Sequence, residues 1–119
     1  MKPNTQLIRS QNDQFRQNIP TSSNVPGRIM ITKGVQDLVS SESEPNRDLA
    51  SLLKVIRTYD AFNNNDPHRE HDFGSFPFKG QKLFWKIDYY AKDMMHGTQN
   101  PADLEITMRV LTVMLALEY

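Results

Sequence analysis

The sequence has no cysteine among its 119 residues and no net charge, because 14 basic side chains balance 14 acidic ones. The lack of cysteine excludes disulfide bonds, thiolate metal sites and a cysteine nucleophile. The lack of net charge argues against binding to nucleic-acid phosphates, so we expect no direct nucleic-acid ligand. No apolar run approaches the roughly 20 residues of a membrane-spanning helix, and residues 1–5 lack an apolar signal core. We therefore expect a cytoplasmic protein that does not associate with a membrane.

What is present is the composition of a single folded domain. Hydrophobic residues make up 38% of the chain and charged residues 24%, which suffices for one core at this length. We predict one domain over residues 1–119, with residues 1–27 as a peripheral helix and linker and residues 28–119 as the core. The pattern favours an α+β fold, in which a small antiparallel sheet of about three strands packs against two or three helices.

Helices and one strand are predicted on both sides of the centre of the chain. A polar pattern predicts a helix over residues 4–18, a β-branched run predicts a strand over residues 28–33, and a short helical piece follows. Apolar residues at a 3.6-residue period predict an amphipathic helix from Pro45 to about residue 62. Asn100 suits a helix N-cap, and the apolar residues after it predict a last helix that covers the sheet.

A β-hairpin over residues 70–90 is the most clearly defined element of the sequence. Lys79 and Gly80 separate two strand-like runs and suit a two-residue turn. The register that follows places Gly74 opposite Trp85, so the indole covers a backbone that has no side chain. One face of the hairpin is then apolar and is expected to contact the helices.

Pro77 indicates which strand of the hairpin lies at the edge of the sheet. Proline lacks an N–H group and is tolerated where that position points away from a neighbouring strand. The first strand of the hairpin is therefore predicted at an edge. The strand at residues 28–33 is predicted beside the second strand of the hairpin.

The opposite face of the hairpin carries a mixture of aromatic and charged side chains. Exposed aromatic residues on such a face are typical of a surface that contacts another protein. The residues predicted to bind a partner are Phe73, Phe84, Lys86 and Asp88.

Histidines and carboxylates gather at the start of the hairpin, where the same register places His71 opposite Asp88. One interpretation is an acid–base pair, with His71 and Asp88 as catalytic candidates of a hydrolase-like enzyme and Asp72 nearby. Another is a metal site built by His68, His71 and Asp88, although the spacing matches no helical zinc motif. The interpretation we favour is a structural polar cluster that satisfies loop N–H groups, for which no cofactor and no metal ion is expected.

Five stretches of the sequence together support a family resemblance. They are Asn65–His68, Glu70–Gly74, Phe84–Tyr90, Pro101–Asp103 and Arg109–Tyr119. In these stretches the chain resembles the uncharacterised domain-of-unknown-function family numbered 3768, with weaker similarity from Ile8 onward. The chain departs from the family pattern at Arg69, where a glycine is expected. The resemblance implies a short protein of a kind often carried on plasmids and other mobile elements, and it implies no reaction, ligand or catalytic residue.

The leading hypothesis is a small non-enzymatic module that binds a protein partner. Carriage on mobile elements suggests, by analogy, an inhibitor of a host defence or nuclease complex. The alternative is a hydrolase-like enzyme or a metal-binding protein that uses the His/Asp cluster. The sequence leaves the oligomeric state open.

Overall fold

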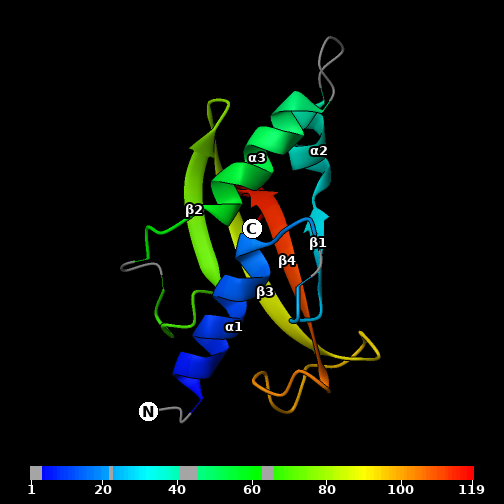
Figure 1. Cartoon of the computed structure of the whole chain (residues 1–119). Coiled ribbons are helices and arrows are strands. Elements are labelled where there is room, and N and C mark those ends of the chain that lie inside the picture. The colour runs from blue at the N-terminus through cyan, green and yellow to red at the C-terminus, as the bar shows by residue number, and fades with distance from the viewer. Residues whose placement is uncertain (1–3, 22, 41–45, 63–65) are drawn as a thin grey trace.

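The computed structural model describes residues 4–21, 23–40, 46–62 and 66–119. Within these ranges the chain forms three α-helices, a four-stranded mixed sheet and a C-terminal 3-10 helix (Figure 1). The predicted α+β class is confirmed, but the sheet has four strands instead of about three and is not purely antiparallel. In chain order the elements are α1 (Thr5–Gln17), β1 (Gly27–Ile31), α2 (Lys33–Val39), α3 (Arg47–Arg57), β2 (Phe73–Phe78), β3 (Gln81–Ala91), β4 (Thr107–Leu115) and η1 (Ala116–Glu118).

The sheet has the strand order β1-β4-β3-β2, and β1 runs parallel to β4 while the other pairs are antiparallel. The hairpin of β2 and β3 has the predicted register, with Phe78 opposite Gln81 and Gly74 opposite Trp85. A Cβ atom at Gly74 would collide with the indole of Trp85, so the ring covers this backbone as predicted. Pro77 lies on the edge strand β2, also as predicted.

The region predicted as the last helix instead forms β4, and this prediction was wrong. Asn100 opens a turn, in which its side-chain oxygen accepts the N–H of Ala102 at 3.1 Å, and the strand β4 follows instead of an α-helix. Because β4 is a central strand with buried residues on both faces, it lacks the alternation that marks a half-exposed strand. Its β-branched residues favour the extended conformation. As a second correction, β1 pairs with β4 and not with β3.

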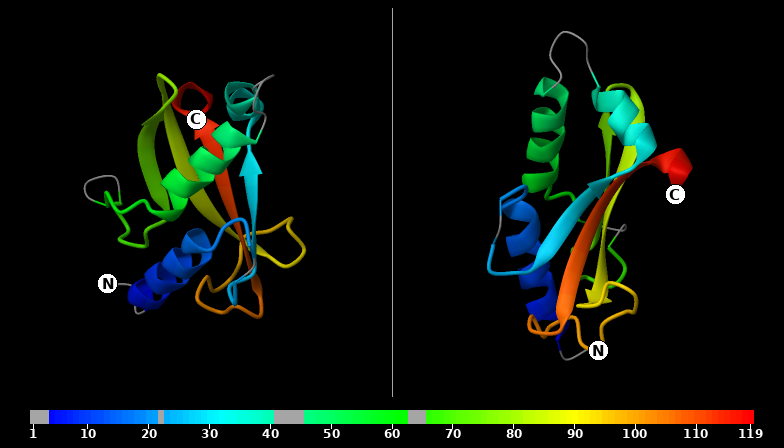
Figure 2. Two further views of the ribbon diagram at one scale, coloured as in Figure 1. Left: turned by 45° about the horizontal axis from the view of Figure 1, so that its top comes forward. Right: turned by 90° about the vertical axis from the view of Figure 1, so that its right-hand side faces the viewer.

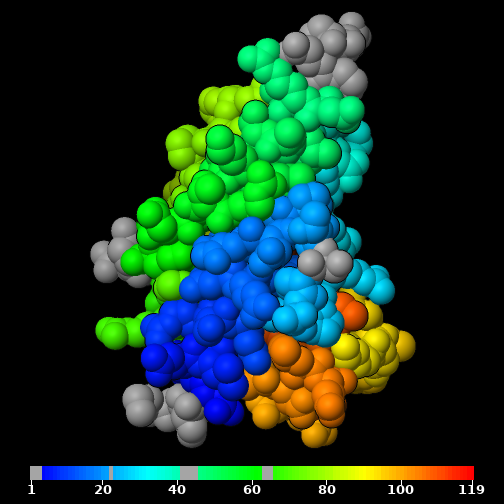
Figure 3. All heavy atoms as spheres, viewed as in Figure 1, coloured from blue at the N-terminus to red at the C-terminus, as the bar shows by residue number. Residues whose placement is uncertain are grey.

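The core lies between the sheet and the helices, because α1 and α3 cover one face of the sheet (Figure 2, right; Figure 3). The predicted amphipathic helix is present as α3, and Pro45, expected in its first turn, lies outside the described residues. The region expected to be peripheral, residues 1–27, supplies Phe15, Ile19 and Val25 to this core. The other buried members of the core are Val35, Val39, Leu52, Ile56, Tyr59, Phe76, Leu83, Trp85, Ile87, Leu111 and Val113.

The other face of the sheet carries no α-helix within the part of the chain that the structure describes (Figure 2). We call this surface the open face. It is built by Arg28 and Met30 of β1, Phe73 and Ser75 of β2, Phe84, Lys86 and Asp88 of β3, and Val110, Thr112 and Met114 of β4. The chain end after η1 folds against it, so that the ring of Tyr119 contacts the ring of Phe84.

Candidate functional site

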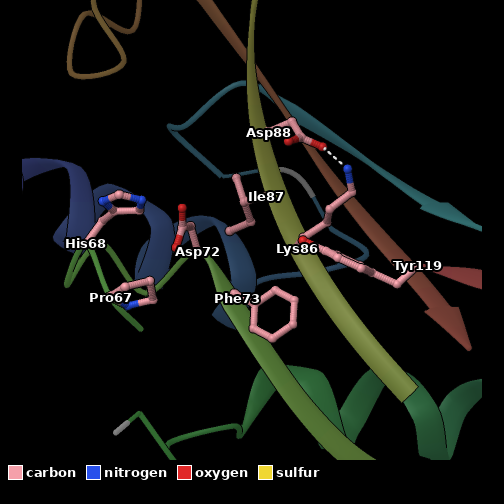
Figure 4. Close-up of a pocket in the computed structure, with 8 residues that line it drawn as sticks. All are labelled: Pro67, His68, Asp72, Phe73, Lys86, Ile87, Asp88 and Tyr119. Carbon is pink, nitrogen blue, oxygen red and sulfur yellow. Dashed lines mark ion pairs between the residues drawn. The ribbon is translucent and has the colours of Figure 1, made fainter. Parts of the chain in front are cut away.

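A pocket of about 380 Å³ opens on the open face, between the start of β2 and the middle of β3 (Figure 4). The loop before β2, strand β3 and the C-terminal residue all line it, so it unites segments that are distant in the sequence. We call it the open-face pocket. Its polar and aromatic lining residues are His68, Asp72, Phe73, Lys86, Asp88 and Tyr119.

Three aromatic rings form a cluster at one side of this pocket. The ring centroids of Phe73 and Phe84 are 5.1 Å apart, and Tyr119 meets Phe84 edge-on at 5.5 Å. The ammonium of Lys82 lies 5.5 Å from the centre of the Phe84 ring. Tyr119 is 77% exposed and was not predicted, because nothing in its position at the end of the sequence indicates this contact. Rings held by one another offer a large apolar surface that loses little conformational entropy on binding.

Lys86 and Asp88 form an ion pair on β3, next to the ring cluster. Their side chains share one face because they are two residues apart on a strand, and the Nζ and Oδ2 atoms are 2.9 Å apart. The hydrogen bond to Asp88 raises the pKa of Lys86, although burial acts in the opposite direction. A half-exposed pair of this kind contributes little to stability.

Asp72 is a partly buried carboxylate that lines the pocket. Burial is the main cause that raises its pKa, and the charges of Glu70 and Asp66 raise it further. A carboxylate held among other carboxylates and partly removed from water favours a proton or a cation nearby. This side of the pocket is therefore electronegative.

A tight turn before β2 determines which side chains reach the pocket. Arg69 and His71 both have a positive φ, of 57° and 53°. Such a conformation suits glycine best, which agrees with the glycine expected at position 69. The Asp66 carboxylate accepts the N–H of His71 at 3.2 Å and holds the turn. Strand pairing ends where the Asp72 carbonyl accepts the N–H of Ile87 at 2.8 Å.

The turn overturns the predicted pairing of His71 with Asp88. The left-handed conformation interrupts the strand alternation and directs His71 to the helical side of the sheet. There its ring stacks on Phe62 with centroids 3.7 Å apart, and its Nδ1 atom lies 2.8 Å from a carboxylate oxygen of Asp13. Asp88 lies on the open face and contacts Lys86 instead. The two catalytic candidates are thus on different sides of the sheet.

The three residues predicted as metal ligands are likewise not brought together. His68 and Asp88 line the open-face pocket, whereas His71 contacts α1. Among the described residues, no group of three or more His, Cys, Asp or Glu side chains is placed to hold a metal ion.

Two buried arginines were not predicted from the sequence, because no local pattern distinguishes them from exposed ones. Arg16 of α1 donates from Nε to the carbonyl of Ile56 at 3.1 Å, which gives a hydrogen-bond partner to one of the carbonyl groups in the last turn of α3. Arg109 of β4 donates from Nε to Asn12 at 2.6 Å and from Nη2 to Gln11 at 2.9 Å. Both residues attach α1 to the rest of the core, which makes their role structural.

A family model described as a protein of unknown function, DUF3768, matches residues 31–118. The chain belongs to this family. The match confirms the resemblance and includes every residue of the open-face pocket except Tyr119. No curated protein and no solved structure matches the chain. No described helix of this DUF3768 protein is long and apolar enough to span a membrane.

Proposed function

We propose that this DUF3768 protein is a small non-enzymatic module that binds a protein partner through its open face. One observation carries the proposal: α1 and α3 cover one face of the sheet, while the other face presents an aromatic cluster beside a pocket. Aromatic anchors surrounded by charged groups are the combination that protein interfaces favour.

The proposed contact is centred on Phe84. Both this ring and that of Phe73 are half-buried, and apolar groups of the partner would cover the aromatic surface that remains exposed. Lys86 and Asp88 lie at the side of these rings, where charges select the correct partner and its orientation more than they add affinity.

Two observations favour a protein over other ligands. The chain has no net charge, and Lys86 on the open face is already paired with Asp88, which weakens the attraction for phosphates. His71, the residue best suited to acid–base chemistry, faces α1 and lies outside the open-face pocket. A nucleic-acid ligand and a hydrolase-like enzyme are therefore less well supported than a protein partner.

In its most specific form, the proposal is that the partner belongs to a host defence or nuclease complex and is inhibited by binding. The support for this form is the family resemblance, since such short proteins are often carried on mobile elements. It is an argument by analogy, because one fold serves many functions.

Exchange of two charges tests the proposed surface. The double variant Lys86→Glu with Asp88→Lys keeps an ion pair within the protein but reverses the charges that a partner meets. We expect affinity capture from producing cells, followed by mass spectrometry, to recover a partner with the wild type. The double variant should recover about a tenth of that amount or less.

The matched control is a second ion pair, Lys33 with Asp37 on α2, whose Nζ and Oδ1 atoms are 2.6 Å apart. The variant Lys33→Glu with Asp37→Lys should capture the partner as the wild type does. If both double variants retain the partner equally well, the open face is not the binding surface.

A further inference from the structure

The two edges of the sheet differ in how they are protected from pairing with another strand. At the β2 edge, Pro77 has no N–H to offer, and the N–H of Ser75 donates to the hydroxyl of Tyr59 at 3.2 Å. Natural sheets use such devices because an unpaired edge binds other strands. β1 forms the opposite margin of the sheet (Figure 2, left), and among the residues that the structure describes no proline within the strand and no side-chain acceptor protects its outward N–H groups in the same way.

The outward groups of β1 follow from its parallel pairing with β4. The carbonyl of Pro26 accepts the N–H of Arg109, and the N–H of Thr32 donates to Val113, each at 3.1 Å. Parallel strands form hydrogen bonds through alternate residues, so the backbone N–H and C=O groups of Arg28 and Met30 also point toward β4. The peptide groups between them, at residues 27, 29 and 31, then point away from the sheet.

These outward groups are almost entirely without partners in the part of the chain that the structure describes. The single exception is the carbonyl of Ile31, which accepts a hydrogen bond from the Gln36 side chain at 3.0 Å. On the open face beside them, Met30 is 56% exposed, although it is a large apolar side chain. An unpaired strand edge is a template for pairing with another strand, and Met30 adds apolar surface directly beside it.

We propose that β1 pairs with β1 of a second copy of this chain, in the antiparallel orientation. The outward peptide groups are symmetric about Ile29, so a two-fold axis there pairs Ile29 with its counterpart and Gly27 with Ile31 of the second copy. The same register places Arg28 opposite Met30 of the second copy and covers the exposed thioether. The absence of net charge means that two copies do not repel one another.

This pairing has a consequence for the open face. A two-fold axis perpendicular to the sheet keeps both sets of helices on one side and places the two open faces side by side. If the open face binds a partner, which rests on the proposed function, the dimer presents two sites at once and gains avidity. The pairing itself does not depend on the partner.

The test is the dissociation constant of the purified full chain, measured by sedimentation equilibrium without any partner. We expect a species of about twice the 13.8 kDa chain mass. Met30→Glu should tighten the dimer about fivefold, because its carboxylate faces Arg28 of the second copy, and Met30→Lys should weaken it about fivefold. The same two changes at Leu7, which is 50% exposed on α1, should leave the constant unchanged.

Ile29→Pro provides an independent variant. It removes an outward N–H and spares the hydrogen bonds between β1 and β4, so we expect a folded monomer by circular dichroism and sedimentation. A wild type that stays monomeric up to about 100 μM would overturn the proposal. So would equal effects of Met30→Glu and Met30→Lys, since only a nearby charge distinguishes them.

Discussion

Asp72 shows at the scale of a single residue how the open face differs from the covered one. Its carboxylate is partly buried, and burial together with Glu70 and Asp66 raises its pKa. A raised pKa means that the folded protein binds this proton more tightly than the unfolded chain does. Above that pKa the charge therefore lowers the free energy of unfolding, and below the unfolded value near 3.8 it has no effect. A destabilising charge beside a pocket is a candidate for a binding role.

We predict that Asp72→Asn raises the free energy of unfolding at pH 7 and that the gain disappears below pH 3.8, where Asp72 is protonated in both states. Urea denaturation at a series of pH values measures this difference. If the proposed function is correct, the same variant should bind the partner less well at pH 7 because the pocket loses negative charge.

Asp93 offers a control of opposite sign. Its carboxylate accepts the N–H of Met95 at 2.8 Å and contacts the ring of His96, and these hydrogen bonds lower its pKa. Asp93→Asn should therefore reduce stability at neutral pH and not raise it. If Asp72→Asn and Asp93→Asn change the free energy of unfolding in the same direction at pH 7, then burial of the Asp72 carboxylate does not destabilise the folded protein.

At the scale of elements, α1 is attached to the sheet by hydrogen bonds as well as by apolar contacts. Asn12 is fully buried, donates to the Glu70 carbonyl at 2.9 Å and to the Tyr89 hydroxyl at 2.7 Å, and accepts from Arg109 at 2.6 Å. This one side chain links α1, the turn before β2, strand β3 and strand β4.

We predict that Asn12→Ala lowers the free energy of unfolding by about 2–4 kcal/mol, because it removes the acceptor of the Arg109 Nε–H and the donor to the Glu70 carbonyl, both in the core. Chemical denaturation measures the loss. Gln14→Ala, at an exposed position of the same helix, should cost under about 0.5 kcal/mol. Equal losses at the two positions would mean that α1 is not held by this network.

The elements that local chemistry determines could be predicted, and those that depend on the whole fold could not. The turn at Lys79 and Gly80, together with Gly74 beneath Trp85, was sufficient to predict the hairpin and its register. The strand β4 was mistaken for a helix, because a strand buried on both faces has no period of two. Its place between β1 and β3 is a property of the assembled sheet.

The same distinction applies to the candidate site. Strand alternation was enough to place Phe73, Phe84, Lys86 and Asp88 on one face. Alternation failed at His71, because a positive φ in the preceding turn depends on hydrogen bonds to Asp66 that no strand pattern contains. Contacts between distant segments, such as that of Tyr119 with the ring cluster, could only come from the fold.

At the scale of the whole molecule, the protein is a sheet with one covered face and one open face. α1 and α3 contribute to the core on the covered face, and no described α-helix covers the open face, where we propose that a partner binds. The unprotected β1 edge adds a second surface at right angles to the first. The two proposals together assign self-association and partner binding to different parts of one sheet.

The most direct test of the central claim is a photo-crosslink from the open face. A photoreactive phenylalanine derivative in place of Phe84 should form a covalent adduct with one other protein in producing cells. The same derivative in place of Leu7, an exposed apolar residue of α1, should not. Exchange of the Lys86 and Asp88 charges should abolish the adduct from position 84. An adduct of equal yield from position 7, or one that survives the charge exchange, would contradict the account.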